Sequence, residues 1–349
     1  MLITRFDYIE FYVSNLPLVQ FLFKHGLGFE NCSRIDSIEN IDYNTSLIFQ
    51  NDINIVLSSS CDSLSELSKE VSLSGDFIKD VAFEVEDIEQ VISNASAFGT
   101  KIIEPVHELF YNQGIIKKAT IASFGNTRHS LIQKIPFIKD GPHLQKQYNN
   151  SPLEKIDHIA VAVEYKNLDK WVDFYKNIFG LQKIFEENVI TEHSGMMSVV
   201  VGSDQKGIKI VLVSPVDGKS RSQISDFISN NNGEGVQHIA FSTSNIIKAI
   251  KDIKNKGVEF LDVNDDYYNK LDLPESYRNS YRDELKNLRI LYDKDEYGEL
   301  LQIFSKKLHS KPTWFLEVLE RKGAKTFGRG NVKKLYESVE KELSKQYAK

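Results

Sequence analysis

Hydrophobic and polar positions follow the same pattern in two distant stretches of the chain. The stretch DVAFEVEDIEQVISNASAFGTKI begins at Asp80, and HIAFSTSNIIKAIKDIKNKGVEF begins at His238. Each predicts a short apolar strand, a turn, a helix with one apolar face, and a glycine before the next strand. The glycines, Gly99 and Gly257, stand nineteen residues after the two starting points. The shared spacing indicates an internal repeat of strand–helix modules.

A second pair of stretches extends the repeat. YIEFYVSN from Tyr8 resembles HIAVAVEY from His158, and each is followed by an aromatic-rich helical pattern that ends near a glycine, FLFKHGLGF and WVDFYKNIFGLQ. We therefore predict an N-terminal domain over residues 1–135 and a second domain over residues 156–349. The segment 136–155 is polar and contains proline and glycine, which is typical of a linker.

Several strands are predicted after each helix. Two strands joined by a glycine turn are predicted for EHSGMMSVVVGSDQKGIKIVLVSP. The closing strand of the fourth module is predicted for YGELLQIFSK, and a further strand for KPTWFLEVLER. Because consecutive strands follow each helix, the sheets need not be fully parallel. We predict an α+β fold of paired βαβββ modules, whose curved mixed sheets enclose a cavity on their concave faces.

The last predicted element is a C-terminal helix, NVKKLYESVEKELSKQYAK, with Leu335 and Val339 on one face. Two interpretations stay open for it. With Gly328 and Gly330 as hinges it would act as a lid over the active site. Without such movement it would be a fixed helix packed on the second domain.

Composition and charge narrow the class of protein. The 349 residues are 41% hydrophobic and 26% charged, as expected for a soluble protein with two cores. The net charge of -6 gives no reason to expect a nucleic-acid partner, and no apolar run is long enough to span a membrane. Cys32 and Cys61 are far apart and form no CxxC pattern, which argues against a thiolate metal site and a disulfide framework and fits a reducing cytoplasm. Since the N-terminus also lacks a signal-peptide pattern, we expect a cytoplasmic protein.

The repeat allows equivalent positions to be compared within one chain. His158 and His238 stand at the start of strands whose counterparts begin with Tyr8 and Asp80. A single histidine in such a place is usually a core residue with satisfied ring nitrogens. Histidines needed only for packing would have no reason to differ between the copies, whereas a metal-binding half and a half without metal would differ in this way. We interpret the two histidines as metal ligands.

A carboxylate would complete the ligand set. Two imidazoles and one carboxylate form the facial triad of non-haem Fe(II) oxygenases, which leaves three positions open. Glu317 is the candidate, because it lies in the apolar stretch WFLEVLE and a buried carboxylate needs a partner or a cation. Strand alternation also permits Glu317 on the solvent face of an edge strand, so both interpretations stay open.

Five motifs in order make a family resemblance specific. The motifs are, in chain order, IDHIAVAV, GVQHIAF, GELLQIF, KPTWFLEVLER and FGRGN. Together they resemble the 4-hydroxyphenylpyruvate dioxygenase family, which includes 4-hydroxymandelate synthase. That family has the vicinal-oxygen-chelate (glyoxalase-like) fold. The resemblance covers nearly the whole chain and is weak over the first 150 residues. It implies Fe(II) held by His158, His238 and Glu317, an arylpyruvate (a 2-oxo acid) and O2 as substrates, and a homodimer or homotetramer.

The reaction implied by the resemblance is oxidative decarboxylation of 4-hydroxyphenylpyruvate followed by hydroxylation, a step of aromatic amino acid metabolism. Attack on the ring gives homogentisate, and attack on the benzylic carbon gives 4-hydroxymandelate. The resemblance implies catalytic roles for Gln302, Ser198 and Tyr336. It implies a substrate pocket formed by Gln223, Phe304, Phe315, Phe327, Val332, Val211 and Val213. Without the resemblance, each Phe would be interpreted as an ordinary core residue. Ser198 and Gln223 would be interpreted as ordinary polar residues of the surface or of a strand.

Several pocket positions depart from the dioxygenase pattern. Val332 and Tyr336 stand where the dioxygenases usually have Phe, and mandelate synthases are more similar there. Val211 and Val213 stand where the dioxygenases typically have Pro and Asn. Since the loss of a ring at 332 would let the substrate's aromatic group move, we predict benzylic hydroxylation to 4-hydroxymandelate, with homogentisate as the alternative. The two valines remove polar groups, so an arylpyruvate without the para-hydroxyl also stays open.

Two other classes of function remain to be tested. A metal-free protein with this fold would use its cavity to sequester an aromatic ligand. An extradiol dioxygenase would cleave a catechol ring with the same two histidines and one glutamate.

Overall fold

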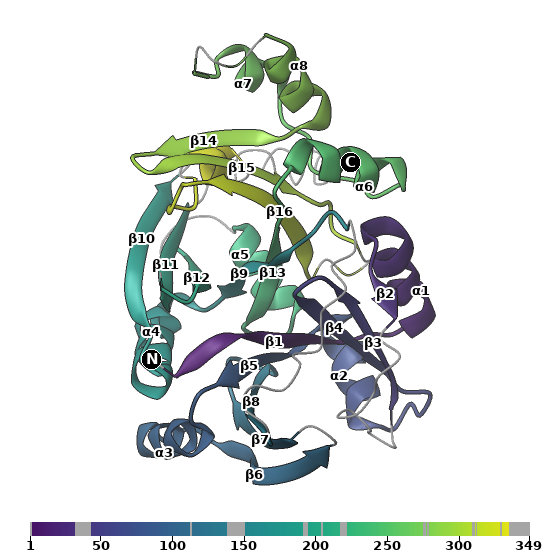
Figure 1. Ribbon diagram of the computed structural model, residues 1–349, viewed down its shortest axis with the longest axis vertical. Coiled ribbons are helices and arrows are strands. Elements are labelled where there is room, and N and C mark those ends of the chain that lie inside the picture. Colours follow the sequence, from purple (N-terminus) through teal and green to yellow (C-terminus); the bar gives the residue numbers. More distant parts are fainter. Residues whose placement is uncertain are drawn as a thin grey trace.

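The computed structural model describes residues 2–31, 43–111, 114–137, 151–190, 195–203, 205–216, 222–274, 277, 279–308, 311, 313–328 and 330–334. The described residues form two curved mixed sheets of eight strands, one from each half, with helices packed around them (Figure 1). This arrangement confirms the predicted α+β fold of paired modules.

The N-terminal half has the strand order β2-β3-β4-β1-β5-β8-β7-β6. Its elements are β1 (Ile3–Tyr12), α1 (Leu16–Phe21), the π-helix η1 (Leu22–Leu27), β2 (Glu30–Asn31), β3 (Asn44–Gln50), β4 (Ile53–Ser59), α2 (Glu66–Ser74), β5 (Phe77–Val85), α3 (Ile88–Phe98), β6 (Ile102–Tyr111), β7 (Gly114–Ala122) and β8 (Arg128–Pro136).

The C-terminal half has the equivalent order β10-β11-β12-β9-β13-β16-β15-β14. Its elements are β9 (Lys155–Ala162), the 3-10 helix η2 (Tyr165–Asn167), α4 (Leu168–Phe179), β10 (Gln182–Ile190), β11 (Gly195–Ser203), β12 (Ile208–Pro215), α5 (Gln223–Asn230), β13 (Gly235–Ser242), α6 (Ile246–Asn255), α7 (Asp265–Asn269), α8 (Asn279–Leu288), β14 (Leu291–Asp295), β15 (Gly298–Phe304) and β16 (Phe315–Lys322).

The glycines of the repeat end helices. The helical segments η1, α3 and α4 stop at Gly28, Gly99 and Gly180, which have positive φ angles of 87°, 81° and 73°. A left-handed residue at this position satisfies the last carbonyls of a helix, and glycine adopts it without steric strain. The glycine spacing therefore predicted these helix ends from the sequence.

One strand assignment from the sequence was wrong. The motif GELLQIF forms β15, which lies inside the sheet between β14 and β16 and does not close the module. The closing strand is β16, which pairs in parallel with β13 and places Glu317 opposite Ala240. Since β16 is an interior strand and Glu317 is only 1% exposed, the solvent-facing interpretation of this residue was wrong as well.

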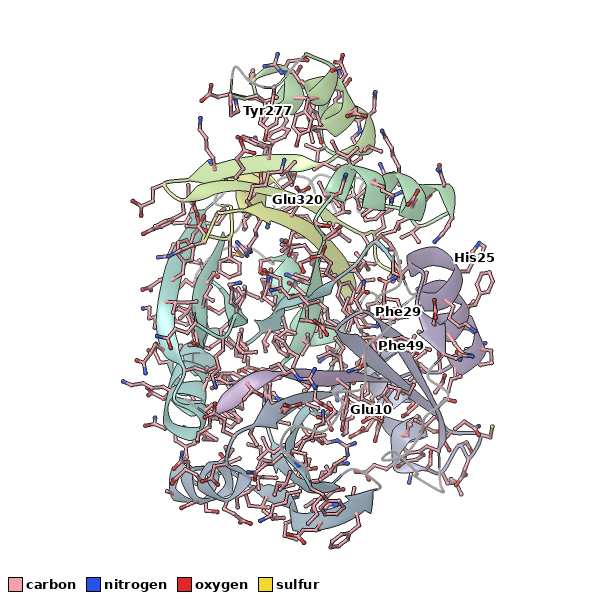
Figure 2. All side chains as sticks on the ribbon, viewed as in Figure 1. Glu10, His25, Phe29, Phe49, Tyr277 and Glu320 are labelled. Atoms are coloured by element: carbon pink, nitrogen blue, oxygen red, sulfur yellow. The ribbon has the colours of Figure 1, made fainter. Side chains whose placement is uncertain are left out.

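Aromatic side chains join the two halves. Trp314, just before β16, packs against Phe11 of β1, with ring centroids 4.9 Å apart. Phe29 packs against Phe241 of β13 at 6.2 Å and lies at the junction of the halves (Figure 2). Thr313 also donates a hydrogen bond of 2.5 Å to the carbonyl of Asp76. The stretch that leads into β16 is thus anchored on the N-terminal half.

Candidate metal centre

Three adjacent strands each contribute one polar side chain to a single point. His158 lies on β9, His238 on β13 and Glu317 on β16, and their ligand atoms all lie within 4.8 Å of one another. Nε2 of His158 is 3.3 Å from Oε2 of Glu317, and Nε2 of His238 is 3.4 Å from the same oxygen. The sheet register produces this convergence, because His158 and Glu317 both stand opposite Ala240 of the strand between them.

Asp157 fixes the orientation of the first imidazole. Nδ1 of His158 lies 2.9 Å from a carboxylate oxygen of Asp157, which can only accept, so Nδ1 carries the proton and Nε2 presents its lone pair. Arg321 donates two hydrogen bonds of 2.9 Å to the same carboxylate. Burial alone would raise the pKa of Asp157, but the hydrogen bonds from His158 and Arg321 hold that pKa well below its usual range.

Gln302 fixes the carboxylate. Its Nε2 donates a 2.8 Å hydrogen bond to Oε1 of Glu317, which leaves Oε2 directed at the imidazoles. Burial raises the pKa of Glu317, but the two neighbouring imidazoles outweigh burial and lower it to about 2. Glu317 therefore remains ionised across the physiological pH range.

The donor set fits a divalent metal ion. Two imidazole nitrogens and one anionic oxygen face one another in a buried place, and Oε2 of Glu317 is shared by both rings. A cation between the three atoms would satisfy all of them, as in the two-histidine, one-carboxylate sites of non-haem iron enzymes. Phe315 stacks on His238 with ring centroids 4.7 Å apart, and Phe327 meets His158 edge-on at 5.0 Å. The aromatic rings thus hold both imidazoles in place.

A cavity opens directly from this cluster. It is lined by His158, Glu187, Met196, Ser198, Val211, Val213, Gln223, Ile224, Gln237, His238, Gln302, Phe304, Phe315, Glu317, Phe327 and Val332. The structure thus brings together every site residue proposed from the sequence except Tyr336. That residue, together with Leu335, Val339 and most of the segment predicted to form a C-terminal helix, lies outside the described residues. Residues 330–334 are helical, and Val332 lies in the cavity wall.

Sequence reasoning missed Glu187, Gln237, Met196 and Ile224. Glu187 is buried, at 8% exposure, and stands opposite Ser198, which in turn stands opposite Val213. The three residues form one row across β10, β11 and β12 on the face that lines the cavity. Had the strand register been known, the alternation of Phe185, Glu187 and Val189 would have indicated this inward position.

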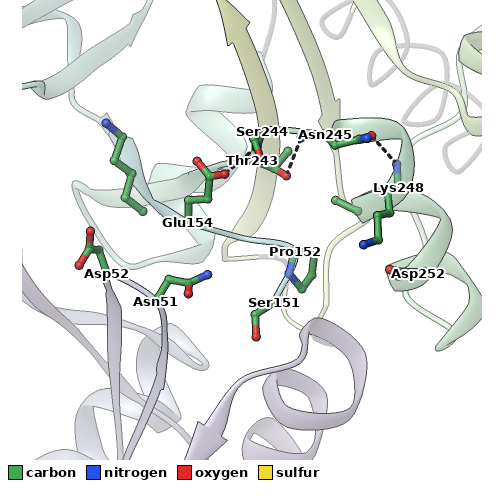
Figure 3. Close-up of a pocket in the computed structure, with 12 residues that line it drawn as sticks. Asn51, Asp52, Ser151, Pro152, Glu154, Thr243, Ser244, Asn245, Lys248 and Asp252 are labelled. Atoms are coloured by element: carbon green, nitrogen blue, oxygen red, sulfur yellow. Dashed lines mark hydrogen bonds between the residues drawn. The ribbon is translucent and has the colours of Figure 1, made fainter. Parts of the chain in front are cut away.

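A second hollow, of about 610 Å³, lies where the β3–β4 turn faces the start of α6 (Figure 3). It is lined mainly by polar residues, among them Asn51, Asp52, Glu154, Asn245 and Lys248. Several of these bond locally, since Glu154 accepts from the backbone of Ser244 and Asn245 caps α6. It includes none of the three converging ligands, so we place the functional site at the smaller cavity.

Comparison with known proteins first gives the class. Residues 155–271 match the family model of the Glyoxalase/Bleomycin resistance protein/Dioxygenase superfamily. A triple mutant of 4-hydroxymandelate synthase from Streptomyces coelicolor superimposes with a TM-score of 0.86 at 26% identity, covering 98% of this chain and 100% of that one. The chain is thus an enzyme of the vicinal-oxygen-chelate fold.

Two curated relatives then give the family. A 4-hydroxyphenylpyruvate dioxygenase of Coccidioides posadasii is 34% identical, covering 80% of this chain and 74% of its own. The protein of that name from Caenorhabditis elegans is 32% identical, covering 98% of this chain and 92% of its own. The chain belongs to the 4-hydroxyphenylpyruvate dioxygenase family, which includes 4-hydroxymandelate synthase, and is a non-haem iron dioxygenase. Among the described residues, no helix combines the length and apolarity needed to cross a membrane.

Proposed function

We propose that this enzyme uses Fe(II) and O2 to decarboxylate 4-hydroxyphenylpyruvate oxidatively and to hydroxylate its ring, giving homogentisate and CO2. The observation that carries the proposal is the convergence of His158, His238 and Glu317 in the wall of a cavity that is also lined by phenylalanine rings. The relatives that are 32–34% identical over most of the chain are named for this activity. They support ring hydroxylation better than the benzylic outcome predicted from the sequence.

Fe(II) held by the triad would bind the 2-oxo acid and dioxygen and would supply electrons that activate O2. The protein's own residues prepare this site. Asp157 keeps the proton on Nδ1 of His158, and Gln302 holds Oε1 of Glu317, so both ligand atoms are oriented before the metal binds.

The cavity walls would orient the substrate. Phe304 and Phe315 offer apolar faces to the aromatic ring, and Ser198, Gln223 and Gln237 offer hydrogen bonds. Glu187 adds a carboxylate that would accept a hydrogen bond from a phenolic hydroxyl. This group changes the expectation drawn from Val211 and Val213, because the pocket keeps a polar partner for a para-hydroxyl group.

A second candidate product is 4-hydroxymandelate. The observation in its favour is that Val332, together with Val211 and Val213, lines the cavity where larger or polar residues would hold the ring more firmly. The similarity to a 4-hydroxymandelate synthase over nearly the whole chain supports the same candidate.

The test is a product assay. Protein loaded with Fe(II) without oxygen is mixed with 4-hydroxyphenylpyruvate and O2, and the products are identified by mass and NMR. Homogentisate supports the proposal, and 4-hydroxymandelate as the only product supports the second candidate. Oxygen uptake with a catechol but not with the oxo acid would indicate extradiol cleavage. Absence of bound iron in both the wild-type protein and His158→Ala would indicate a metal-free binding protein.

A further inference from the structure

A chain of side-chain hydrogen bonds leads from Glu317 to the surface helix α7. Gln302 donates to Glu317 at 2.8 Å, and Nδ2 of Asn331 donates to Oε1 of Gln302, also at 2.8 Å. Oδ1 of Asn331 lies 3.2 Å from the hydroxyl of Tyr267 on α7. Asn331 is fully buried and Gln302 nearly so, at 0% and 2% exposure. Four residues that are distant in the sequence thus form one continuous relay.

The relay has a fixed direction. The carboxylate of Glu317 can only accept, so the amide of Gln302 must turn its NH2 group towards it and its oxygen towards Asn331. Asn331 must then turn its own NH2 group to Gln302 and its oxygen to Tyr267. The Tyr267 hydroxyl provides the donor at the far end and shares its hydrogen between Asn331 and the carbonyl of Tyr292, which lies 2.8 Å away. The hydroxyl also accepts from the Tyr292 backbone N–H at 2.8 Å, so it is held on β14.

Glycine at position 328 makes room for the relay. A Cβ on Gly328 would lie 2.5 Å from Oε1 of Gln302 and 3.2 Å from Nδ2 of Asn331, and φ at this residue is +72°. Both the close approach and the left-handed conformation exclude a larger side chain. The glycine, which in the sequence reads as a hinge, is therefore required where the C-terminal segment passes over Gln302.

Other contacts fasten the same segment to β14 and to β16. Asp293 accepts from the backbone N–H of Gly330 at 2.8 Å, and Asp295 accepts from the N–H groups of Lys325 and Thr326 at 2.8 and 2.9 Å. Arg321, which holds Asp157, also donates to the carbonyl of Thr326 at 2.6 Å. Residues 324–328 and 330–334 are thus positioned by the strands that carry or support the metal ligands.

We infer that Tyr267 and Asn331 are positioning residues for the metal centre. Neither contacts a metal ligand; they act through Gln302, whose orientation keeps Oε2 of Glu317 on the two imidazoles. Attachment of the C-terminal segment to α7 and β14 is therefore coupled to metal affinity. By linkage, bound metal must stabilise the attached segment to the same extent. The inference rests on the proposed metal site.

The test compares two neighbouring tyrosines. Tyr267→Phe removes the terminal donor of the relay. Tyr268→Phe is the control, because Tyr268 is the next residue on α7, is more deeply buried than the partly buried Tyr267, and its hydroxyl has no hydrogen-bond partner among the described residues. Affinity for Co(II) and Fe(II) is measured without substrate and without oxygen, by competition with a coloured chelator. We expect Tyr267→Phe to weaken metal binding about tenfold, at the lower end of the range for residues that support metal ligands, and Tyr268→Phe to leave it unchanged.

Hydrogen exchange provides a second measurement. Co(II) is expected to slow exchange of the Val332 N–H, which bonds to the Gly328 carbonyl at 2.8 Å, and to slow it less in Tyr267→Phe. Equal affinity in the wild type and Tyr267→Phe overturns the inference, as does an equal loss in both variants, which would indicate general core packing. If the wild-type protein binds neither metal, the proposed function fails before the relay is tested.

Discussion

At the scale of single residues, Asp157 connects the metal centre to the rest of the second half. Its carboxylate accepts from His158 and from Arg321, and Lys209 lies 3.3 Å away. The carboxylate therefore sets both the tautomer and the ring orientation of one ligand. Residues in this position contribute substantially to metal affinity without contacting the metal.

The first prediction concerns Asp157→Asn. An amide of the same size can present its NH2 group to Nδ1, which would move the proton to Nε2 and block the lone pair that binds metal. We expect the affinity for Fe(II) or Co(II) to fall ten- to a hundredfold, measured by chelator competition. Asp173→Asn, at an exposed position on α4, is the control and is expected to bind metal normally. Similar affinities in both variants would contradict this role of Asp157.

The second prediction concerns the product ratio. Val332→Phe adds a ring to the cavity wall and is expected to lower the share of 4-hydroxymandelate among the products, whereas Val332→Ala is expected to raise it. A difference of ~1 kcal/mol between the competing barriers would change the ratio about fivefold. The measurement is quantitative NMR of the products of all three proteins. An identical ratio in the three would show that position 332 does not control how the ring is held.

The two histidines that converge with Glu317 could be singled out from the sequence because the repeat supplied a comparison. His158 and His238 differ from Tyr8 and Asp80, and this difference needed no structure to be seen. Glu187 was not predictable, since FEENV reads as a polar strand until its partner strands are known. The relay through Asn331 was equally hidden, because it joins four segments that only the folded sheet brings together.

At the scale of elements, the first sheet contains a cluster of ion-paired residues around the positions that are equivalent to the candidate metal centre of the second sheet. Asp80 stands opposite Arg128 on β8, and two residues on, Ser130 occupies the place that Glu317 has on β16. Asp80 accepts from Arg128 at 2.9 Å and from the Ser130 hydroxyl at 2.6 Å, and Glu10 accepts from Arg128 at 2.9 Å. Among the described residues, the Arg128 guanidinium thus pairs with two carboxylates in this sheet, where the other sheet has the three candidate metal ligands.

The third prediction follows from this cluster. Arg128→Gln leaves two buried carboxylates, Asp80 and Glu10, without their cation, which is far more costly than losing a surface pair. Since Arg128 is partly exposed, we expect a loss of about 2–3 kcal/mol in the free energy of unfolding, measured with urea. Arg5→Gln removes the more exposed pair with Glu84 and is expected to lose no more than about 1 kcal/mol. Equal losses of unfolding free energy in the two variants would indicate that the burial of Asp80 does not increase the cost of removing its cation.

Elements differed in how far the sequence predicted them. The strands and helices of the repeat were recognised because alternation and glycine spacing occur twice. The wrong assignment of the closing strand arose because GELLQIF and KPTWFLEVLER are both apolar strands, and their order in a sheet depends on pairing. Helices α7 and α8 have no counterpart among the described residues of the other modules, and the repeat gave no indication of them.

At the scale of the whole molecule, the two halves meet around a buried histidine. His129 of β8 is fully buried, and its Nδ1 lies 2.9 Å from the carbonyl of Val81, so Nδ1 carries the proton. Nε2 has one lone pair to accept with, and the hydroxyls of Tyr175, on α4 of the other half, and of Ser123 lie 2.9 and 3.0 Å from it. The neutral ring is thus fully satisfied, and the rings of Phe83, Phe124, Phe174 and Phe179 surround it. This packing between halves was not predictable, because no local pattern links β8 to α4.

The fourth prediction is a pH dependence of stability that arises at this junction. Burial lowers the pKa of His129 to about 4, and neither its hydrogen bond to Val81 nor nearby Asp80 offsets that effect. His129 therefore binds a proton near pH 6.5 in the unfolded chain but only near pH 4 in the folded chain. The stabilisation is complete above pH 6.5 and is lost as the pH falls towards 4, by about 3 kcal/mol.

The measurement must separate the effect of His129 on stability from the effects of the carboxylates and candidate metal ligands that titrate in the same pH range. Urea unfolding of metal-free wild type and His129→Gln between pH 7.5 and 4.5 does this, because all other groups are common to both proteins. His129→Gln is expected to be less stable at neutral pH, and its stability should fall by about 2 kcal/mol less than that of the wild type on acidification. Parallel curves would mean that the ring is protonated in the folded protein. The junction between the halves would then have to contain a charge that its surrounding phenylalanines cannot solvate.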